Sequence, residues 1–360
     1  MARPGSLYPL GYLLALSPPA LLVGGLVMHL PYLLFIVLFG IAPLTRALLG
    51  NIPEERGEWS EWVTTWLDRL PMLASAVYVL ALGSVLVMVH SLPPSSLGDW
   101  VGLGMSLWTC LFCAIPVAHE LIHRRGFERA VGNALAGVTG YPELEGEHIR
   151  HHSVSGVVEL PEWPRLNDSM WSYVWRRIPH AMHSAWQHHL TLRRSRTHRS
   201  HLYVGLTVMA ATAGLFAFTA GAAGVALYLL VTLGVRFTVH AVNFMQHWGL
   251  GSDNVADGSD RRYGWECRCV LQGWMMLNIA LHHSHHQHST APYYRLVPAA
   301  SSPRLPAGYA LLLFIGMVPP LWRKLMVPAL AVWKENPAHQ IEPGGLRIIC
   351  ISLPRERQPA

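Results

Sequence analysis

Three stretches of the chain place histidines at spacings that suit metal binding. His119 and His123 stand four residues apart in "HELIHRR". Two further stretches, "HIRHHS" and "HHSHHQHS", each contain an H-x-x-H-H pattern. These patterns are formed by His148, His151 and His152 and by His282, His285 and His286. Because helix residues three and four apart share a face, each pattern presents its imidazoles together, as ligands that suit iron, copper or zinc.

The number of histidines indicates how many metal ions the site holds and which metal is expected. Eight histidines in three clusters are too many for one zinc ion, which takes three or four protein ligands. The sequence has no cysteine set at zinc-finger spacing, and His247 in "NFMQHWGL" adds a ninth candidate. Two ions that share about nine imidazoles fit better, and iron suits oxygen chemistry. The residues therefore predict a di-iron site.

The elements that position these histidines belong to a membrane protein. Of the 360 residues, 51% are hydrophobic and 13% are charged, whereas about 25% are charged in ordinary soluble domains. Six apolar segments are long enough for a spanning helix, which needs roughly 20 residues; they are 7–28, 30–49, 72–91, 97–117, 202–222 and 225–244. A seventh stretch, 309–327, is interrupted by "VPPLW" and is expected to be re-entrant, interfacial or packed on the bundle. The predicted fold is all-α and integral to the membrane, with six transmembrane helices and a cytoplasmic, histidine-rich di-iron cap.

The distribution of charge predicts which side of the membrane carries the site. The segment 124–199 contains eleven arginines, whereas the turns assigned outside, near His29, near Ala220 and in "HSLPPSSLGDW", contain no Lys or Arg. By the positive-inside rule, the four histidine motifs and both termini are cytoplasmic. The net charge of +6 is attributed to loops that face anionic lipid, and no nucleic-acid partner is expected.

These assignments divide the chain into four parts. Residues 1–117 hold transmembrane helices 1 to 4, and 118–201 form a cytoplasmic segment with the first two histidine motifs. Residues 202–250 hold helices 5 and 6, and 251–360 carry the last histidine cluster and a cytoplasmic C-terminal segment. We expect a multi-pass protein of a bacterial inner membrane. Cys110 and Cys113 form a C-x-x-C inside "LWTCLFCAIPV", which favours buried packing.

The four motifs together resemble those of the membrane alkane monooxygenases and xylene monooxygenases, relatives of the integral-membrane fatty acid desaturases. The resemblance rests on "HELIHRR", "EHIRHHSVSG" with "PEWP", "NFMQHWGL" and "LHHSHHQHS", and it covers roughly 97–296. It implies two iron ions held by nine histidines: His119, His123, His148, His151, His152, His247, His282, His285 and His286. It also implies an O2-dependent enzyme that hydroxylates the terminal methyl group of an apolar substrate such as an alkane or alkyl-aromatic. A rubredoxin or ferredoxin-type donor with its reductase would supply the electrons.

Several positions depart from the alkane-monooxygenase pattern. The second motif is one residue shorter, as in desaturases, "PEDP" reads "PEWP", and the Glu before the lone histidine is Gln246. The last motif, usually H-S-D-H-H, reads "HHSHH", so the first ligand is either His282 or His283; the H-x-x-H-H spacing favours His282. The short second motif keeps open a fatty acid desaturase or an oxidative decarboxylase that forms terminal alkenes. A histidine-rich metal transporter is a more distant alternative.

Two carboxylates adjoin the candidate ligands. Glu120 follows His119, and Glu147 precedes His148. Each carboxylate can accept the second N–H of a coordinated imidazole, which would orient the ring. Each can equally pair with a neighbouring arginine, so the sequence leaves both alternatives open.

Overall fold

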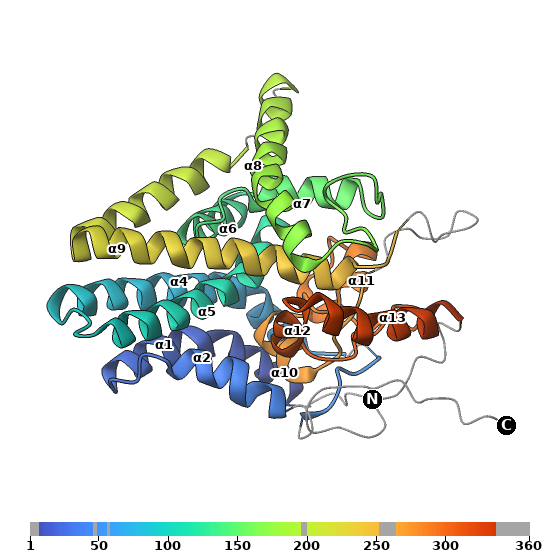
Figure 1. The fold of residues 1–360 in the computed structure, drawn as a ribbon, viewed down its shortest axis with the longest axis horizontal. Coiled ribbons are helices and arrows are strands. Elements are labelled where there is room, and N and C mark those ends of the chain that lie inside the picture. The colour runs from blue at the N-terminus through green and yellow to red at the C-terminus, as the bar shows by residue number, and fades with distance from the viewer. Residues whose placement is uncertain (1–6, 46–48, 56–57, 196–199, 252–263, 336–360) are drawn as a thin grey trace.

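The computed structural model describes residues 7–45, 49–55, 58–195, 200–251 and 264–335. These residues are helical, and their β-structure is limited to isolated bridges of Asn51 with Cys269 and of Glu266 with Arg304. The elements are η1 (Tyr8–Leu16), α1 (Ser17–Val27), α2 (Leu33–Ile36), η2 (Val37–Ile41), η3 (Ala42–Thr45), α4 (Glu61–Ser91), α5 (Leu97–Ile122), α6 (Phe127–Val138), α7 (Leu144–Ser153), α8 (Met170–Ser195), α9 (Leu202–His247), α10 (Val270–Met275), α11 (His282–Gln287), η5 (Tyr293–Arg295), α12 (Tyr309–Gly316) and α13 (Pro319–Glu335). Helices α1, α4, α5 and α9 form one bundle (Figure 1).

Four helical stretches are long and apolar enough to cross a membrane: Tyr8–Val27, Glu61–Ser91, Leu97–Ile122 and Leu202–His247. Their outer surfaces carry large apolar side chains, of which Leu80 is 70% and Phe218 78% exposed. Patches of this kind are rare on soluble monomers but suit contact with lipid. The helices therefore agree with the predicted multi-pass membrane protein.

Helix α9 is two arms joined by a sharp break. A straight helix of its 46 residues would measure about 69 Å, more than twice a bilayer's hydrocarbon core. The backbone leaves helical geometry at Ala220 and Gly221, and Gly221 adopts a φ of 57° and a ψ of −138°, which favours glycine. The chain reverses there, and the two arms diverge from the break in a V shape (Figure 1). This break lies where the sequence predicts the turn between segments 202–222 and 225–244.

The predicted span over 30–49 is not matched by a continuous long helix. The described residues of this region form the short apolar stretch Leu33–Leu44, which passes from α-helix through a π turn to a 3-10 turn. That length is below the roughly 20 residues needed to cross a bilayer. Six complete spans are therefore not confirmed.

The remaining elements gather where α5 and the second arm of α9 end. Helices α7 and α11 lie at that end of the bundle, and α12 packs on α9 (Figure 1). The stretch 309–327 forms α12 and the start of α13, so the alternative in which it packs on the bundle is the one observed. The four histidine motifs are thus brought to one end of the helix bundle.

Candidate metal centre

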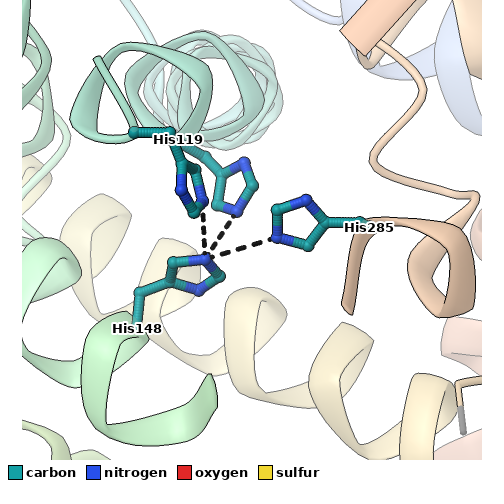
Figure 2. A group of neighbouring side chains, drawn as sticks. His119, His148 and His285 are labelled. Atoms are coloured by element: carbon teal, nitrogen blue, oxygen red, sulfur yellow. Dashed lines mark hydrogen bonds between the residues drawn. The ribbon is translucent and has the colours of Figure 1, made fainter. Parts of the chain in front are cut away.

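The first histidine cluster joins three elements that are far apart in the sequence. His119 and His123 come from the end of α5, His148 from α7 and His285 from α11, and one ligand atom from each lies within 4.8 Å of all the others. His148 Nε2 is 3.0 Å from His119 Nε2, 2.9 Å from His123 Nε2 and 3.4 Å from His285 Nε2. Figure 2 shows His119, His148 and His285 pointing toward one another. The rings thus surround a common point.

The second cluster is formed by His151, His247, His282 and His286, whose ligand atoms also lie within 4.8 Å of one another. His282 Nε2 is 2.9 Å from His247 Nε2 and 3.0 Å from His286 Nε2. His151 Nε2 is 3.2 Å from His286 Nε2. The cluster therefore joins α7, the end of α9 and α11.

His152 lies at the boundary between the two clusters. Its Nε2 is 2.9 Å from His148 Nε2 and 3.0 Å from His285 Nε2, which places it with the first cluster. Its ring also stacks on His286 of the second cluster, with centroids 4.4 Å apart. All nine histidines predicted from the sequence are thus in one assembly of two adjoining clusters.

The two H-x-x-H-H patterns are used in opposite ways. On α7, the first and last histidines of the pattern face the first cluster and His151 faces the second. On α11, His282 and His286 face the second cluster and His285 faces the first. Each short helix therefore contributes to both clusters, so α7 and α11 together fix the separation between them.

This arrangement fits a pair of metal ions. A metal–imidazole bond is roughly 2.1 Å long, and two such bonds at right angles hold their nitrogens about 3 Å apart. The separations of 2.9 to 3.4 Å between Nε2 atoms match that geometry. The donors are all nitrogen, as expected for a redox metal held by neutral imidazoles. Two adjoining clusters therefore suit the dimetal site that the sequence predicts.

Burial keeps these imidazoles able to bind metal. Seven of the nine side chains are at most 7% exposed: His119, His148, His151, His247, His282, His285 and His286. Loss of solvation, reinforced by neighbouring imidazoles, lowers the pKa of His148, His151 and His285 well below the usual value for histidine. The pKa values of His282 and His286 are lowered for the same reasons. These rings are therefore neutral at pH 7, with a lone pair available to a cation.

Three buried glutamates hold α7 in place. Glu143 pairs with Arg236 of α9, Glu145 with Arg129 of α6, and Glu147 with Arg177 of α8. The Glu147 carboxylate also accepts a hydrogen bond from Tyr141 at 3.3 Å. Because removing one partner of a buried pair leaves an uncompensated charge, these contacts tie the ligand helix to three neighbours.

The sequence left two roles open for Glu120 and Glu147, and the ion-pair role is the one observed. Glu120 Oε1 lies 3.4 Å from the Arg124 guanidinium, just past the end of α5, and Glu147 pairs with Arg177. The prediction that Cys110 and Cys113 are packing residues is confirmed, since both are buried, free thiols in α5.

Two residues beside the clusters, Trp163 and Ser155, are not among the predicted ligands. Trp163 of "PEWP" packs on both His247 and His151, with ring centroids 3.9 Å and 5.6 Å apart. Ser155 Oγ is 3.0 Å from His286 Nδ1 and so fixes the ring whose Nε2 faces the cluster. The altered motif "PEWP" drew attention to Trp163, whereas nothing in the sequence distinguishes Ser155.

Glu266 supports the start of α11. Its buried carboxylate accepts hydrogen bonds from the backbone N–H of Ser284 at 3.2 Å and from the Ser302 hydroxyl at 2.6 Å. Burial raises the pKa of Glu266 to about 7, against the opposing effect of these hydrogen bonds. An acceptor at a helix start satisfies an N–H that the helix itself leaves unpaired. Glu266 therefore positions the helix that presents three of the candidate ligands.

An apolar pocket lies along the second arm of α9, which ends at His247. It contains about 750 Å³ of empty space, counting its open mouth, and is lined by residues of the 38–43 segment, α5, α9, α10 and α12. Val242 in its wall precedes His247 by five residues, a rise of about 7.5 Å along the helix. The pocket therefore comes within about one and a half turns of α9 of the second cluster, although none of the nine histidines lines it.

The fold and this centre together define a class of membrane oxidoreductase, and comparison with known proteins agrees. The family model for fatty acid desaturases matches residues 97–316, which include all nine histidines. The chain therefore belongs to the fatty acid desaturase family. It is a di-iron oxidoreductase of that family. The alternative of a metal transporter is therefore set aside.

Within this family, the similar proteins are monooxygenases. The chain is 28% identical to alkane 1-monooxygenase 2 of Pseudomonas aeruginosa over 86% of its length and 87% of the relative. It is 26% identical to alkane 1-monooxygenase 2 of Alcanivorax borkumensis, covering 88% of this chain and 87% of that one. It is 25% identical to the xylene/toluene monooxygenase hydroxylase component of Pseudomonas putida over 64% of each. The resemblance inferred from the motifs is thus confirmed as distant homology over most of the chain.

Proposed function

We propose that this protein is a membrane monooxygenase that hydroxylates an unactivated C–H bond, at the terminal methyl group of an alkane, alkyl-aromatic or similar apolar substrate. One oxygen atom of O2 would enter the C–H bond, and the other would be reduced to water with two electrons and two protons. The observation that carries the proposal is the pair of buried histidine clusters in a bundle of apolar helices that also holds an apolar pocket. Similarity to alkane and xylene monooxygenases supports it.

The chain's own residues would bind, orient and shield the reacting groups. We assign the nine histidines named above as the ligands of two iron ions, with His152 beside both clusters. When bound, the irons would supply the O2 activation needed to cleave a strong C–H bond. Trp163 covers the rings of His151 and His247 and limits the access of water. The apolar pocket would hold the hydrocarbon without competing polar contacts.

Product analysis tests this proposal. Cells that express the chain would be fed dodecane, an alkylbenzene and dodecanoic acid in turn, and the products would be identified by mass spectrometry. We expect a primary alcohol with the carbon number of the hydrocarbon unchanged, and one oxygen atom derived from labelled O2. A His148→Ala variant serves as the inactive control. Absence of any oxygenated hydrocarbon, with the acid consumed instead, would contradict the hydroxylase assignment.

A second candidate is a fatty acid desaturase or an oxidative decarboxylase with the same di-iron centre. The short spacing of His148, His151 and His152, which resembles the desaturase motif, favours it. The same feeding experiment separates the outcomes. Desaturation would give a double bond with all carbons retained, and decarboxylation would give a terminal alkene one carbon shorter than the acid.

Electrons would come from a separate protein. The sequence contains no flavin, nicotinamide or iron–sulfur motif, and membership of this family implies an electron-transfer partner and O2. We propose a rubredoxin or a ferredoxin-type carrier with its reductase. An acidic carrier would complement the arginine-rich segment 124–199.

The proposed orientation places the histidine clusters and both termini in the cytoplasm. It has six membrane crossings if the 33–45 segment is counted as one crossing and each arm of α9 as another. Single cysteines at two exposed positions, Leu92→Cys and Glu159→Cys, test this in a Cys350→Ser background. The four cysteines of the described residues are buried and should react slowly. In intact cells, an impermeant maleimide should label Leu92→Cys but label Glu159→Cys only after permeabilisation. Labelling in the reverse order would invert the topology.

A further inference from the structure

One polar side chain in the apolar pocket has a donor that the protein does not use. Gln272 of α10 lines the pocket together with Tyr309 of α12. Its Oε1 accepts the backbone N–H of Tyr309 at 3.2 Å and the Cys267 thiol at 3.4 Å. Because a backbone N–H can only donate, this contact fixes which end of the amide is oxygen. The Nε2 atom is buried and has no hydrogen-bond partner among the described residues.

An unused amide donor in such surroundings has a thermodynamic cost. A buried donor left unsatisfied loses its hydration without compensation, and native structures contain few such groups. The rest of the pocket is mainly Leu, Phe, Met, Ala and Val, so it offers Gln272 Nε2 no carbonyl or carboxylate. A ligand with an oxygen acceptor would satisfy the donor, whereas a pure hydrocarbon would not.

One end of the pocket lies nearer the histidine clusters than the other. Tyr309 Oη accepts a hydrogen bond from Gln246 Nε2 at 2.8 Å, and Gln246 immediately precedes His247. Gln272 is bonded to the backbone of that same Tyr309. Thr238, in the pocket wall on α9, lies nine residues before His247, a rise of about 13.5 Å. The unused donor is therefore at the histidine end, and the apolar walls extend away from it.

We propose that the pocket binds a single-chain amphiphile whose oxygen-bearing head group accepts a hydrogen bond from Gln272 Nε2. The head group, a carboxylate or a hydroxyl, lies at the histidine end, and the apolar chain extends between α5 and α9 toward Phe112 and Thr238. Gln272 is thus a specificity-determining residue. This inference rests on the proposed function only in taking the pocket as the substrate site. A hydroxyl at the histidine end would be that of the alcohol product, whereas a carboxylate there would turn the terminal methyl group away from the histidines and fit the second candidate function.

Photo-crosslinking of the purified full-length protein in lipid nanodiscs tests the inference. The probe is dodecanoic acid with a diazirine in the middle of its chain, and the labelled peptides are mapped by mass spectrometry. Dodecanoic acid, dodecanol and dodecane are then compared as competitors. We expect labels on the pocket-lining parts of α5, α9, α12 or the 38–43 segment, with the acid, the alcohol or both competing at about tenfold lower concentration than dodecane. The better of the two identifies the head group.

Two variants separate hydrogen bonding from packing. Gln272→Met keeps a side chain of similar length but removes the amide, so the tenfold preference should disappear while competition by dodecane stays the same. Met275→Leu, in the same pocket wall, should retain the preference. Equal competition by all three compounds in the wild type would overturn the inference, as would labelling confined to other helices. Equal weakening of all three by Gln272→Met would show a merely structural role and also overturn it.

If Gln272→Met does not fold, the comparison of the three competitors on the wild-type protein still tests the inference by itself. The outcomes are also separate from those of the proposed function, because binding is measured without turnover. A protein that prefers the acid or alcohol but hydroxylates nothing would contradict the proposed function and leave this inference standing. A protein that hydroxylates dodecane without any head-group preference would support the proposed function and contradict this inference.

Discussion

Replacing His148 or His285 by Ala is expected to remove iron and activity together. The purified wild-type protein should hold about two irons per chain and little zinc. His148 Nε2 lies within 3.4 Å of the Nε2 atoms of four other histidines: His119, His123, His152 and His285. Loss of this ring opens the first cluster at its centre, so turnover should fall by more than the roughly 100-fold limit typical of residues that only support a ligand. Metal analysis by mass spectrometry and a turnover assay measure both effects.

His183→Ala is the matched control, because His183 is an exposed histidine outside both clusters. It should keep about two irons and wild-type turnover. One zinc per chain with no iron in the wild type would contradict the di-iron assignment. Full iron in His148→Ala and His285→Ala would show that the first cluster is not a metal site.

Replacing His282 should have a much larger effect than replacing its neighbour His283. His282 Nε2 lies 2.9 Å from His247 Nε2 and 3.0 Å from His286 Nε2, inside the second cluster. His283 is fully buried but belongs to neither cluster of the described residues. His282→Ala should therefore be poor in iron and inactive. His283→Ala should keep most of its iron, with turnover reduced at most about 10- to 100-fold through looser packing of α11.

This pair is internally controlled, since both changes delete one buried imidazole from the same turn of α11. Iron content distinguishes a ligand from a packing residue, because a cavity left by either ring should cost similar stability. The reverse result would mean that the His-Ser pair marks the ligand register, as in the alkane monooxygenases. Full iron in both variants would remove the H-x-x-H-H argument for this helix.

The sequence by itself was sufficient to bring out the nine histidines and the membrane character of the chain. Both depend on local information. Residues three and four apart on a helix share a face whatever surrounds them, so the spacing within α7 and α11 already predicts converging imidazoles. Apolar composition likewise predicts long buried or lipid-facing helices.

Only the tertiary structure decided how the histidines divide between the two clusters. His148 and His151 are three residues apart on one helix, yet they face different clusters because α5 packs on one side and the end of α9 on the other. Contacts across more than 100 residues, such as His152 with His285, follow from helix packing and not from spacing. The spacing of the histidines in the sequence does not specify which helices pack together.

The residues that support the ligands, and the lengths of the spans, could also not be predicted from the sequence. Ser155, Glu266 and Gln272 belong to common residue types at unremarkable spacings, and their roles arise from what is folded against them. The segment 30–49 is apolar enough to suggest a full span, but its described residues form only a short helix with π and 3-10 turns. Apolar composition determines that a segment avoids water, whereas its length and path depend on the helices beside it.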